Sequence, residues 1–332
     1  MTPPDQGLAL ATRGLRKSYG SRVALAGLDL SVPSGVVYGF LGPNGAGKTT
    51  TMRLLTGLLH PDSGSIELLG KPFSRGDRRR LFDVGALIES PSFYPYLSGR
   101  KNLRELAAAG ALVPPGRVEE LLELVGLRER ANEAVSTYSM GMKQRLGIAA
   151  ALLSDPALLL LDEPSNGLDP AGIVAMRETL RHLASIGKTV FVSSHLLAEV
   201  QVMADVVGII AAGRLVREGT LDDLLGSEEL VRVRVPRESV AVATIVLSAI
   251  APAIAPTVAS GDETSPDVWL RVHTQSQQAS EINRLLAGAG IYASGLESGS
   301  DLEMLFLELT GGQPVAGSEG TFQGIMGPAG RP

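Results

Sequence analysis

The sequence of 332 residues contains no cysteine. This absence excludes disulfide bonds, catalysis by a thiolate and metal centres held by cysteine sulfur. Since nothing in the chain requires an oxidising compartment, we expect a cytoplasmic location.

The sequence also lacks hydrophobic runs of the kind that target or span a membrane. Residues 1–7 contain no basic region followed by an apolar stretch, so they do not resemble a secretory signal. Residues 239–260 are rich in Ala, Val and Ile, but Pro252 and Pro256 interrupt them. Because a membrane-spanning helix needs about 20 strongly apolar residues, we predict a soluble helix and a loop here, and no transmembrane segment.

An excess of basic charge is missing as well. The chain has 30 Lys and Arg against 35 Asp and Glu, which gives a formal net charge of −5. Nucleic-acid-binding proteins normally carry a basic surface, so we predict no nucleic-acid partner. The arginines at 78–80 are interpreted as a solvated helix face, with a local basic patch as the alternative.

The hydrophobic pattern predicts an α/β fold. Alternation over 8–32 indicates strands, with Leu28, Leu30 and Val32 on one face. Apolar runs that are typical of buried strands then alternate with helical patterns, which is the order of a parallel sheet. The predicted strands cover 36–41, 65–69, 158–161 and 189–193, and the predicted helices cover 49–59, 117–125 and 171–186.

The length and the change of composition after residue 220 predict two domains. We place the first at 1–225, with a mainly helical part at about 90–155, and a smaller α/β domain at 226–310. The smaller domain is predicted to contain strands over 231–235 and 268–273 and helices over 239–250, 276–287 and 301–309. Residues 311–332 lack periodicity and are predicted to be a disordered tail.

A phosphate-binding loop is predicted between the strand at 36–41 and the helix that follows. Residues 42–49 fit the pattern G-x-x-x-x-G-K-[ST] in full. Glycines there allow backbone N–H groups to turn towards phosphate, Lys48 can reach the β- and γ-phosphates, and Thr49 can ligate Mg²⁺. The predicted nucleotide-binding residues of this segment are Gly42, Pro43, Asn44, Gly45, Ala46, Gly47, Lys48, Thr49 and Thr50.

Two carboxylates follow the apolar strand at 158–161. Asp162 and Glu163 would lie at the carboxyl end of that strand, where ligands bind in open α/β sheets. Phosphoryl transfer to water needs a metal-binding group and a group that polarises the water. We therefore predict that Asp162 holds Mg²⁺ through water and that Glu163 acts on the attacking water.

Further motifs make the chain resemble ATP-binding-cassette (ABC) proteins over about residues 8–225. The segment 138–142 (YSMGM) resembles the family's signature motif, in which Ser139 and Gly141 keep the positions that contact γ-phosphate. The resemblance assigns Asp169 to the D-loop, His195 to the switch histidine that bonds γ-phosphate, and Tyr19 to the aromatic residue that stacks on adenine. It implies a P-loop ATPase core with an antiparallel β subdomain and a helical subdomain.

One position departs from the usual family pattern. In the segment 84–91 (VGALIESP), Glu89 stands where the family usually has a glutamine that contacts Mg²⁺ and faces the membrane partner. A carboxylate can still ligate Mg²⁺. This segment, the signature region and the end of the C-terminal domain at 302–311 are similar to ATPase subunits of peptide-antibiotic and drug self-resistance exporters of the bacitracin-transporter type.

The resemblance implies partners as well as chemistry. It predicts a head-to-tail dimer in which Ser139 of one copy faces Lys48 of another across ATP, and a separate transmembrane permease that places the chain on the cytoplasmic side of the membrane. The alternatives are an importer ATPase, or a soluble ABC ATPase that acts on ribosomes or DNA. Two cassettes in one chain or a long coiled coil, which would indicate such soluble members, are not visible in the sequence.

Overall fold

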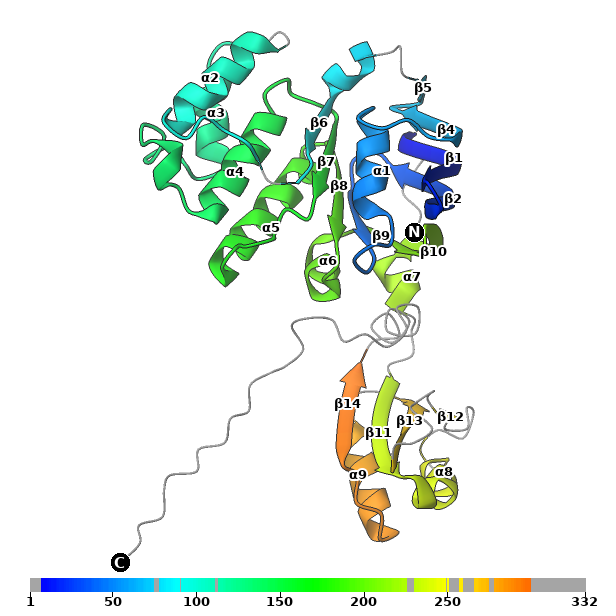
Figure 1. Cartoon of the computed structure of the whole chain (residues 1–332). Helices are drawn as coiled ribbons and strands as arrows, with labels where there is room; N and C mark the ends of the chain where they lie inside the picture. Colours follow the sequence, from blue (N-terminus) through cyan, green and yellow to red (C-terminus); the bar gives the residue numbers. More distant parts are fainter. Residues whose placement is uncertain are drawn as a thin grey trace, which may run out of the picture.

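The fold contains three β-sheets, as the computed structural model shows in Figure 1. The structure describes residues 7–74, 78–89, 91–110, 113–225, 230–248, 250, 257–258, 266–274 and 278–299. The predicted helix over 301–309 and the predicted tail over 311–332 lie outside the described residues. None of the described helices is long and apolar enough to cross a membrane.

The first sheet is antiparallel and has the strand order β2-β1-β4-β5. Its strands are β1 (Leu8–Tyr19), β2 (Arg22–Pro33), β4 (Ser63–Leu68) and β5 (Lys71–Phe73). The prediction of strands over 8–32 is confirmed, and Leu28, Leu30 and Val32 are fully buried. A two-residue turn joins β1 to β2, so that Tyr19 lies opposite Arg22.

The second sheet has the order β10-β9-β3-β8-β7-β6 and lies beside the first sheet (Figure 1). Its strands are β3 (Val37–Leu41), β6 (Val84–Leu87), β7 (Leu158–Asp162), β8 (Thr189–Ser194), β9 (Val206–Ala211) and β10 (Arg214–Thr220). The strands β6, β7, β8, β3 and β9 pair in parallel, and β10 is antiparallel to β9. Every residue of β3, β7 and β8 is buried, which explains their continuous apolar runs.

Helices pack against the second sheet and follow the ends of its strands. They are α1 (Lys48–Leu55), α5 (Pro170–Ser185), α6 (Leu197–Met203) and α7 (Leu221–Leu225), and a 3₁₀ helix, η1 (Arg78–Asp83), precedes β6. Helix α1 ends four residues before the predicted boundary at 59. Gly57 has φ of 69°, and its N–H donates to the Leu54 carbonyl at 3.1 Å, so the chain leaves the helix there.

A helical unit lies on the side of the second sheet that is away from the first sheet (Figure 1). It contains α2 (Gly99–Ala109), α3 (Arg117–Leu124), a 3₁₀ helix η2 (Val135–Thr137) and α4 (Met140–Ala151). Leu121, Leu122 and Val125 are buried, Val118 on the same helix is half-buried, and Gly126 follows with φ of 65°. The predicted helical region at about 90–155 therefore corresponds to helices that lie between residues 99 and 151.

The third sheet belongs to the C-terminal part of the chain and has the order β12-β13-β11-β14. Its elements are β11 (Leu230–Pro236), η3 (Arg237–Ser239), α8 (Val240–Leu247), β12 (Thr257–Val258), β13 (Asp267–His273), α9 (Ala279–Gly288) and β14 (Gly295–Gly299). Val231, Val233 and Val235 alternate into a core of their own with residues of α8 and α9. The strands over 231–235 and 268–273 and the helices of α8 and α9 had been predicted, whereas β12 and β14 had not.

Candidate functional site

The site is built on the loop between β3 and α1, at the carboxyl edge of the second sheet. Gly45 and Gly47 have φ of 82° and 115°, a conformation that favours glycine. A Cβ on Gly47 would lie 2.8 Å from the Ala24 carbonyl oxygen, and one on Gly42 would lie 2.5 Å from the Ile210 carbonyl oxygen. Gly45 is therefore required for its conformation, Gly42 for space and Gly47 for both, as expected of a loop that wraps around phosphate.

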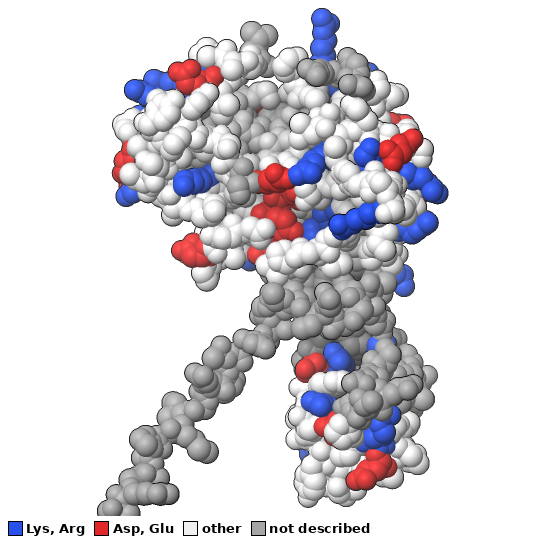
Figure 2. Space-filling model, in the orientation of Figure 1, with Lys and Arg blue, Asp and Glu red and all other residues white. Residues whose placement is uncertain are grey.

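A cavity lies over this loop and collects residues from four parts of the chain. Of the residues predicted to bind nucleotide or act on it, the cavity is lined by Tyr19, Asn44, Gly45, Gly47, Lys48, Thr49, Thr50, Glu163 and His195. It is also lined by Arg22, Ala24, Arg53 and Asn166, which sequence reasoning had missed. Figure 2 shows acidic side chains in the middle of the N-terminal part of the molecule, with basic side chains beside them.

Lys48 is the first residue of α1, and its side chain is only 5% exposed. Its ammonium group donates to the Gly42 carbonyl at 2.7 Å and to the Pro43 carbonyl at 3.3 Å. It also lies 3.1 Å from Oε1 of Glu163. These contacts hold the cation over the loop, where it faces the cavity.

Glu163 follows β7 directly, and its φ of 48° turns the chain sharply at this position. Its N–H donates to the carbonyl and the hydroxyl of Ser193 on β8, at 3.2 and 3.0 Å. Its carboxylate reaches Lys48 with one oxygen, and Oε2 lies 2.7 Å from Nδ1 of His195. The carboxylate after β7, the cation at the start of α1 and the imidazole after β8 thus meet in the cavity.

Asp162 is the last residue of β7 and is 5% exposed. It accepts a hydrogen bond from the Ser193 hydroxyl. Its carboxylate and the Thr49 hydroxyl are hard oxygen donors, and Mg²⁺ prefers one or two such protein ligands together with phosphate oxygens. The donor set of these two residues therefore fits Mg²⁺ bound with a nucleotide.

Glu89 has a different environment from Asp162. It has φ of 65°, its side chain is 59% exposed, and its carboxylate accepts a hydrogen bond from Arg53 of α1. Arg53 lines the cavity, whereas Glu89 is not among its lining residues. The structure therefore places Glu89 next to the site through Arg53, and its role in metal binding stays a prediction.

Comparison with known proteins identifies the family. The sequence profile of the ABC transporter family matches residues 25–166. The chain is 38% identical to the bacitracin transport ATP-binding protein BcrA of Enterococcus faecalis, over 92% of this chain and 98% of that protein. It is 43% identical to the lantibiotic transport ATP-binding protein SrtF of Streptococcus pyogenes, over 67% of this chain and 95% of that protein.

The chain belongs to the family of ABC transporter ATP-binding proteins. It is therefore an ATPase that couples the hydrolysis of ATP to transport. The structure agrees, because a solved ATP-binding subunit of an ABC transporter covers 65% of this chain with a TM-score of 0.59 and 31% identity. The expected ABC ATPase core is thus confirmed, with its antiparallel first sheet and its helical unit.

Eight predicted site residues do not line the cavity of this ABC protein, namely Gly42, Pro43, Ala46, Glu89, Ser139, Gly141, Asp162 and Asp169. Ser139 caps α4 by accepting a hydrogen bond from the Met142 N–H at 3.2 Å, and Gly141 lies in the first turn of that helix. Asp169 caps α5 in the same way, by accepting from the Gly172 N–H at 3.0 Å. The helical unit therefore contributes no residue to the described lining of the cavity in its own chain.

Four lining residues had not been predicted, for reasons that differ. Arg22 and Ala24 belong to β2, whose alternating pattern had predicted a strand and one apolar face but no contact with a ligand. Asn166 lies three residues before Asp169, which the resemblance had assigned to the D-loop, and Arg53 lies one turn after the phosphate loop in α1. The closeness of Arg53 to Lys48 along the same helix was the one signal that could have indicated it.

Proposed function

We propose that this ABC ATPase drives the export of a peptide antibiotic through a separate transmembrane permease. The observation that carries the proposal is the similarity to a bacitracin transport ATP-binding protein over 98% of that protein's length. The match extends beyond the ATPase core, so the C-terminal part of the chain is included in it. A lantibiotic transport ATP-binding protein supports the same substrate class. These relatives do not favour the two alternatives, an ATPase of an importer or a soluble ATPase that acts on ribosomes or DNA.

The chemistry is proposed to be ATP hydrolysis with Mg²⁺ held by Thr49 and Asp162. Mg²⁺ would neutralise charge on the phosphate oxygens when it is bound. Lys48 would bind the β- and γ-phosphates, while the Glu163 carboxylate would orient and polarise the attacking water. His195, which is held by Glu163 at 2.7 Å, would donate a hydrogen bond towards γ-phosphate.

The ATP site is proposed to be completed by a second copy of the chain. Ser139 and Gly141 lie at the exposed start of α4, and they do not line the cavity of their own chain. A head-to-tail dimer would bring this helix start, with its favourable dipole, to the γ-phosphate bound by Lys48 of the other copy. Asp169 at the start of α5 would lie near the same interface.

The permease is the partner that a transport ATP-binding protein requires, because it supplies the path for the substrate. We propose that the chain binds it at the cytoplasmic face of the membrane, where ATP is available. Closing and opening of the dimer around ATP would then be transmitted to the permease, as phosphate-driven order changes commonly are.

The test is antibiotic sensitivity in the native host after deletion of the gene. The host should become more sensitive to bacitracin or a lantibiotic, and keep its sensitivity to an antibiotic that is not a peptide. Complementation by the native gene should restore resistance, whereas Glu163→Gln should not. Unchanged sensitivity to all peptide antibiotics tested would reject the proposed substrate class while leaving the ATPase assignment intact.

A further inference from the structure

Three basic side chains line the nucleotide cavity, namely Arg22, Lys48 and Arg53. Lys48 is paired with Glu163, and Arg53 is paired with Glu89. The Arg22 guanidinium has neither a hydrogen bond nor an ion pair with any residue that the structure describes, and Arg22 is exposed. Within the described part of the chain, Arg22 is therefore the cavity cation whose N–H donors have no partner.

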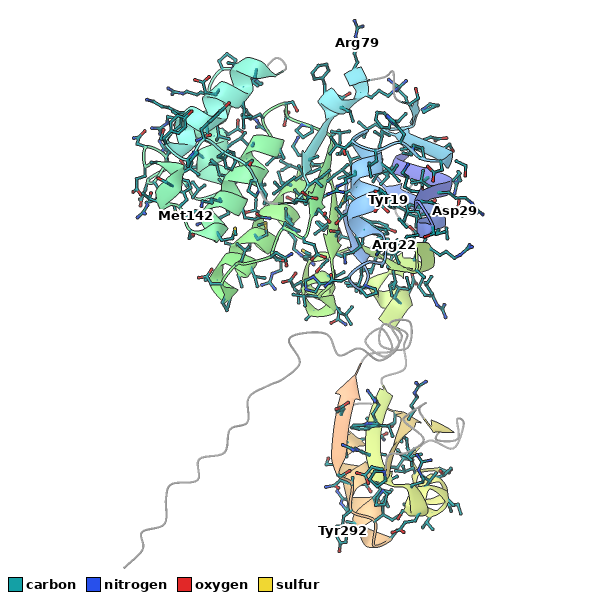
Figure 3. The ribbon with its side chains drawn as sticks, viewed as in Figure 1. Tyr19, Arg22, Asp29, Arg79, Met142 and Tyr292 are labelled. Atoms are coloured by element: carbon teal, nitrogen blue, oxygen red, sulfur yellow. The ribbon has the colours of Figure 1, made fainter. Side chains whose placement is uncertain are left out.

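The position of Arg22 places its charge next to the phosphate loop. It begins β2 directly across the hairpin from Tyr19, and Figure 3 shows both side chains near α1. Nη2 of Arg22 lies 3.4 Å from the point that a Cβ on Gly45 would occupy. Because Gly45 belongs to the phosphate loop, this distance places the guanidinium beside that loop.

We propose that Arg22 binds a phosphate oxygen of the nucleotide. A guanidinium presents paired N–H donors that match the oxygens of a phosphate group, and it stays charged at all physiological pH values. The hairpin would thus contribute two contacts of different kinds, an aromatic face from Tyr19 for the base and a cation from Arg22 for the phosphates. This inference rests on the binding of a nucleotide at the phosphate loop.

The Arg22 guanidinium lies close to the backbone of Gly45 in the phosphate loop. At 3.4 Å, an added Cβ would be in contact with the guanidinium and would occupy part of the space between Arg22 and the loop. The guanidinium is thus close enough to the loop backbone to reach a phosphate that the loop N–H groups hold.

The test measures the ADP affinity of the full chain by calorimetry at about 0.05 M and about 0.5 M salt. Salt screens a contact between an exposed cation and phosphate, but it does not screen stacking of a base on an aromatic ring. Arg22→Ala should weaken ADP binding by about tenfold at low salt, and the factor by which it weakens binding should become smaller at high salt. Tyr19→Ala should weaken binding by a similar ratio at both salt concentrations.

Further variants separate charge from geometry and from fold. Arg22→Lys keeps the charge without the forked donors, so it should bind ADP with intermediate affinity. Arg22→Glu should weaken binding more than Arg22→Ala. Arg13→Ala is the matched control, because Arg13 is an exposed arginine of the same hairpin that does not line the cavity. It should bind ADP as the native protein does.

Two results would overturn the proposal. One is native ADP affinity in Arg22→Ala at low salt, and the other is a loss of affinity whose ratio to native does not change with salt. Failure of the native protein to bind ADP would instead reject the nucleotide site itself, and with it the proposed ATP chemistry. The design therefore distinguishes the failure of this inference from the failure of the proposed function.

Discussion

The Glu163 carboxylate lies 3.1 Å from the Lys48 ammonium group, and both side chains are largely buried. The residue proposed to act on water is thus an ion-pair partner of the residue proposed to bind phosphate. A bound γ-phosphate would compete with Glu163 for Lys48, since both are anions that the same cation would hold. Transfer of Lys48 to phosphate would free the carboxylate to accept a proton from water.

Glu163→Gln should reduce ATP hydrolysis by about 100-fold or more, because a general base contributes about that much. ATP affinity should be equal to or higher than native, since an amide competes less well than a carboxylate for Lys48. The protein should accumulate as an ATP-bound dimer in size-exclusion chromatography with ATP and Mg²⁺. Glu178→Gln, an exposed glutamate of α5, is the control. A Glu163→Gln protein that remains monomeric at high concentration would count against the proposed dimer.

Lys48→Ala should abolish ATP binding or hydrolysis and leave the fold intact. The change removes the cation, while the loop glycines and the pairing of Glu163 with His195 are retained. Phosphate release and calorimetry measure the loss, and circular dichroism checks the fold. Lys101→Ala, an exposed lysine of α2, should behave as native. Normal turnover by a folded Lys48→Ala protein would contradict the role assigned to this residue.

Glu89 is predicted to act through the metal ion. Glu89→Gln retains one oxygen ligand, so hydrolysis should stay within about tenfold of native, or about 1.4 kcal/mol of barrier. Glu89→Ala removes the ligand and should raise the Mg²⁺ concentration needed for half-maximal activity. The measurement is the ATPase rate as a function of Mg²⁺ concentration for the native protein and both variants.

The ion pair with Arg53 gives the alternative for Glu89. If the carboxylate serves only to hold Arg53, Glu89→Ala should change the ATP concentration needed for activity and leave the Mg²⁺ dependence unchanged. Superimposable Mg²⁺ curves for the native protein and Glu89→Ala would therefore show that Glu89 does nothing for the metal.

The environment of Tyr38 should make the free energy of unfolding depend on pH in the alkaline range. Its ring is buried and stacks on Phe191 with centroids 5.2 Å apart, and its hydroxyl donates to Glu218 at 2.5 Å. Burial first, and then the Glu218 charge and hydrogen bond, raise the pKa of Tyr38 well above 10.0. Because the unfolded chain releases this proton at about pH 10, the contribution to stability is full below that pH and declines as the pH rises above it.

Tyr38→Phe should cost about 1 kcal/mol near neutral pH by removing the hydrogen bond to Glu218. Its stability should then fall less steeply than that of the native protein above about pH 10. Urea unfolding between about pH 8 and about pH 11 measures both effects. Tyr292→Phe, at a tyrosine that is 78% exposed in the C-terminal part, is the control. Parallel pH profiles for native and Tyr38→Phe would rule out this role.

The sequence by itself determined the parts of the molecule that depend on neighbouring residues. The phosphate loop at 42–49 is a contiguous pattern whose glycines and lysine need only the strand before them and the helix after them. Asp162 and Glu163 were predictable for the same reason, because an apolar run long enough for one buried strand ends directly before them. The core faces of β2 and α3 followed from periodicities of two and 3.6 residues.

Only the tertiary structure decided which distant residues meet. Arg53 and Glu89 are 36 positions apart, and their pairing depends on how α1 packs near the end of β6. Arg22 reaches the phosphate loop because the hairpin of the first sheet lies beside the second sheet, which no local pattern encodes. Likewise, β14 contains two glycines and little apolar surface, and it forms a strand because β11 supplies its hydrogen-bond partners. Such contacts depend on how whole helices and strands pack against one another. No local pattern of residues in the sequence predicts that packing.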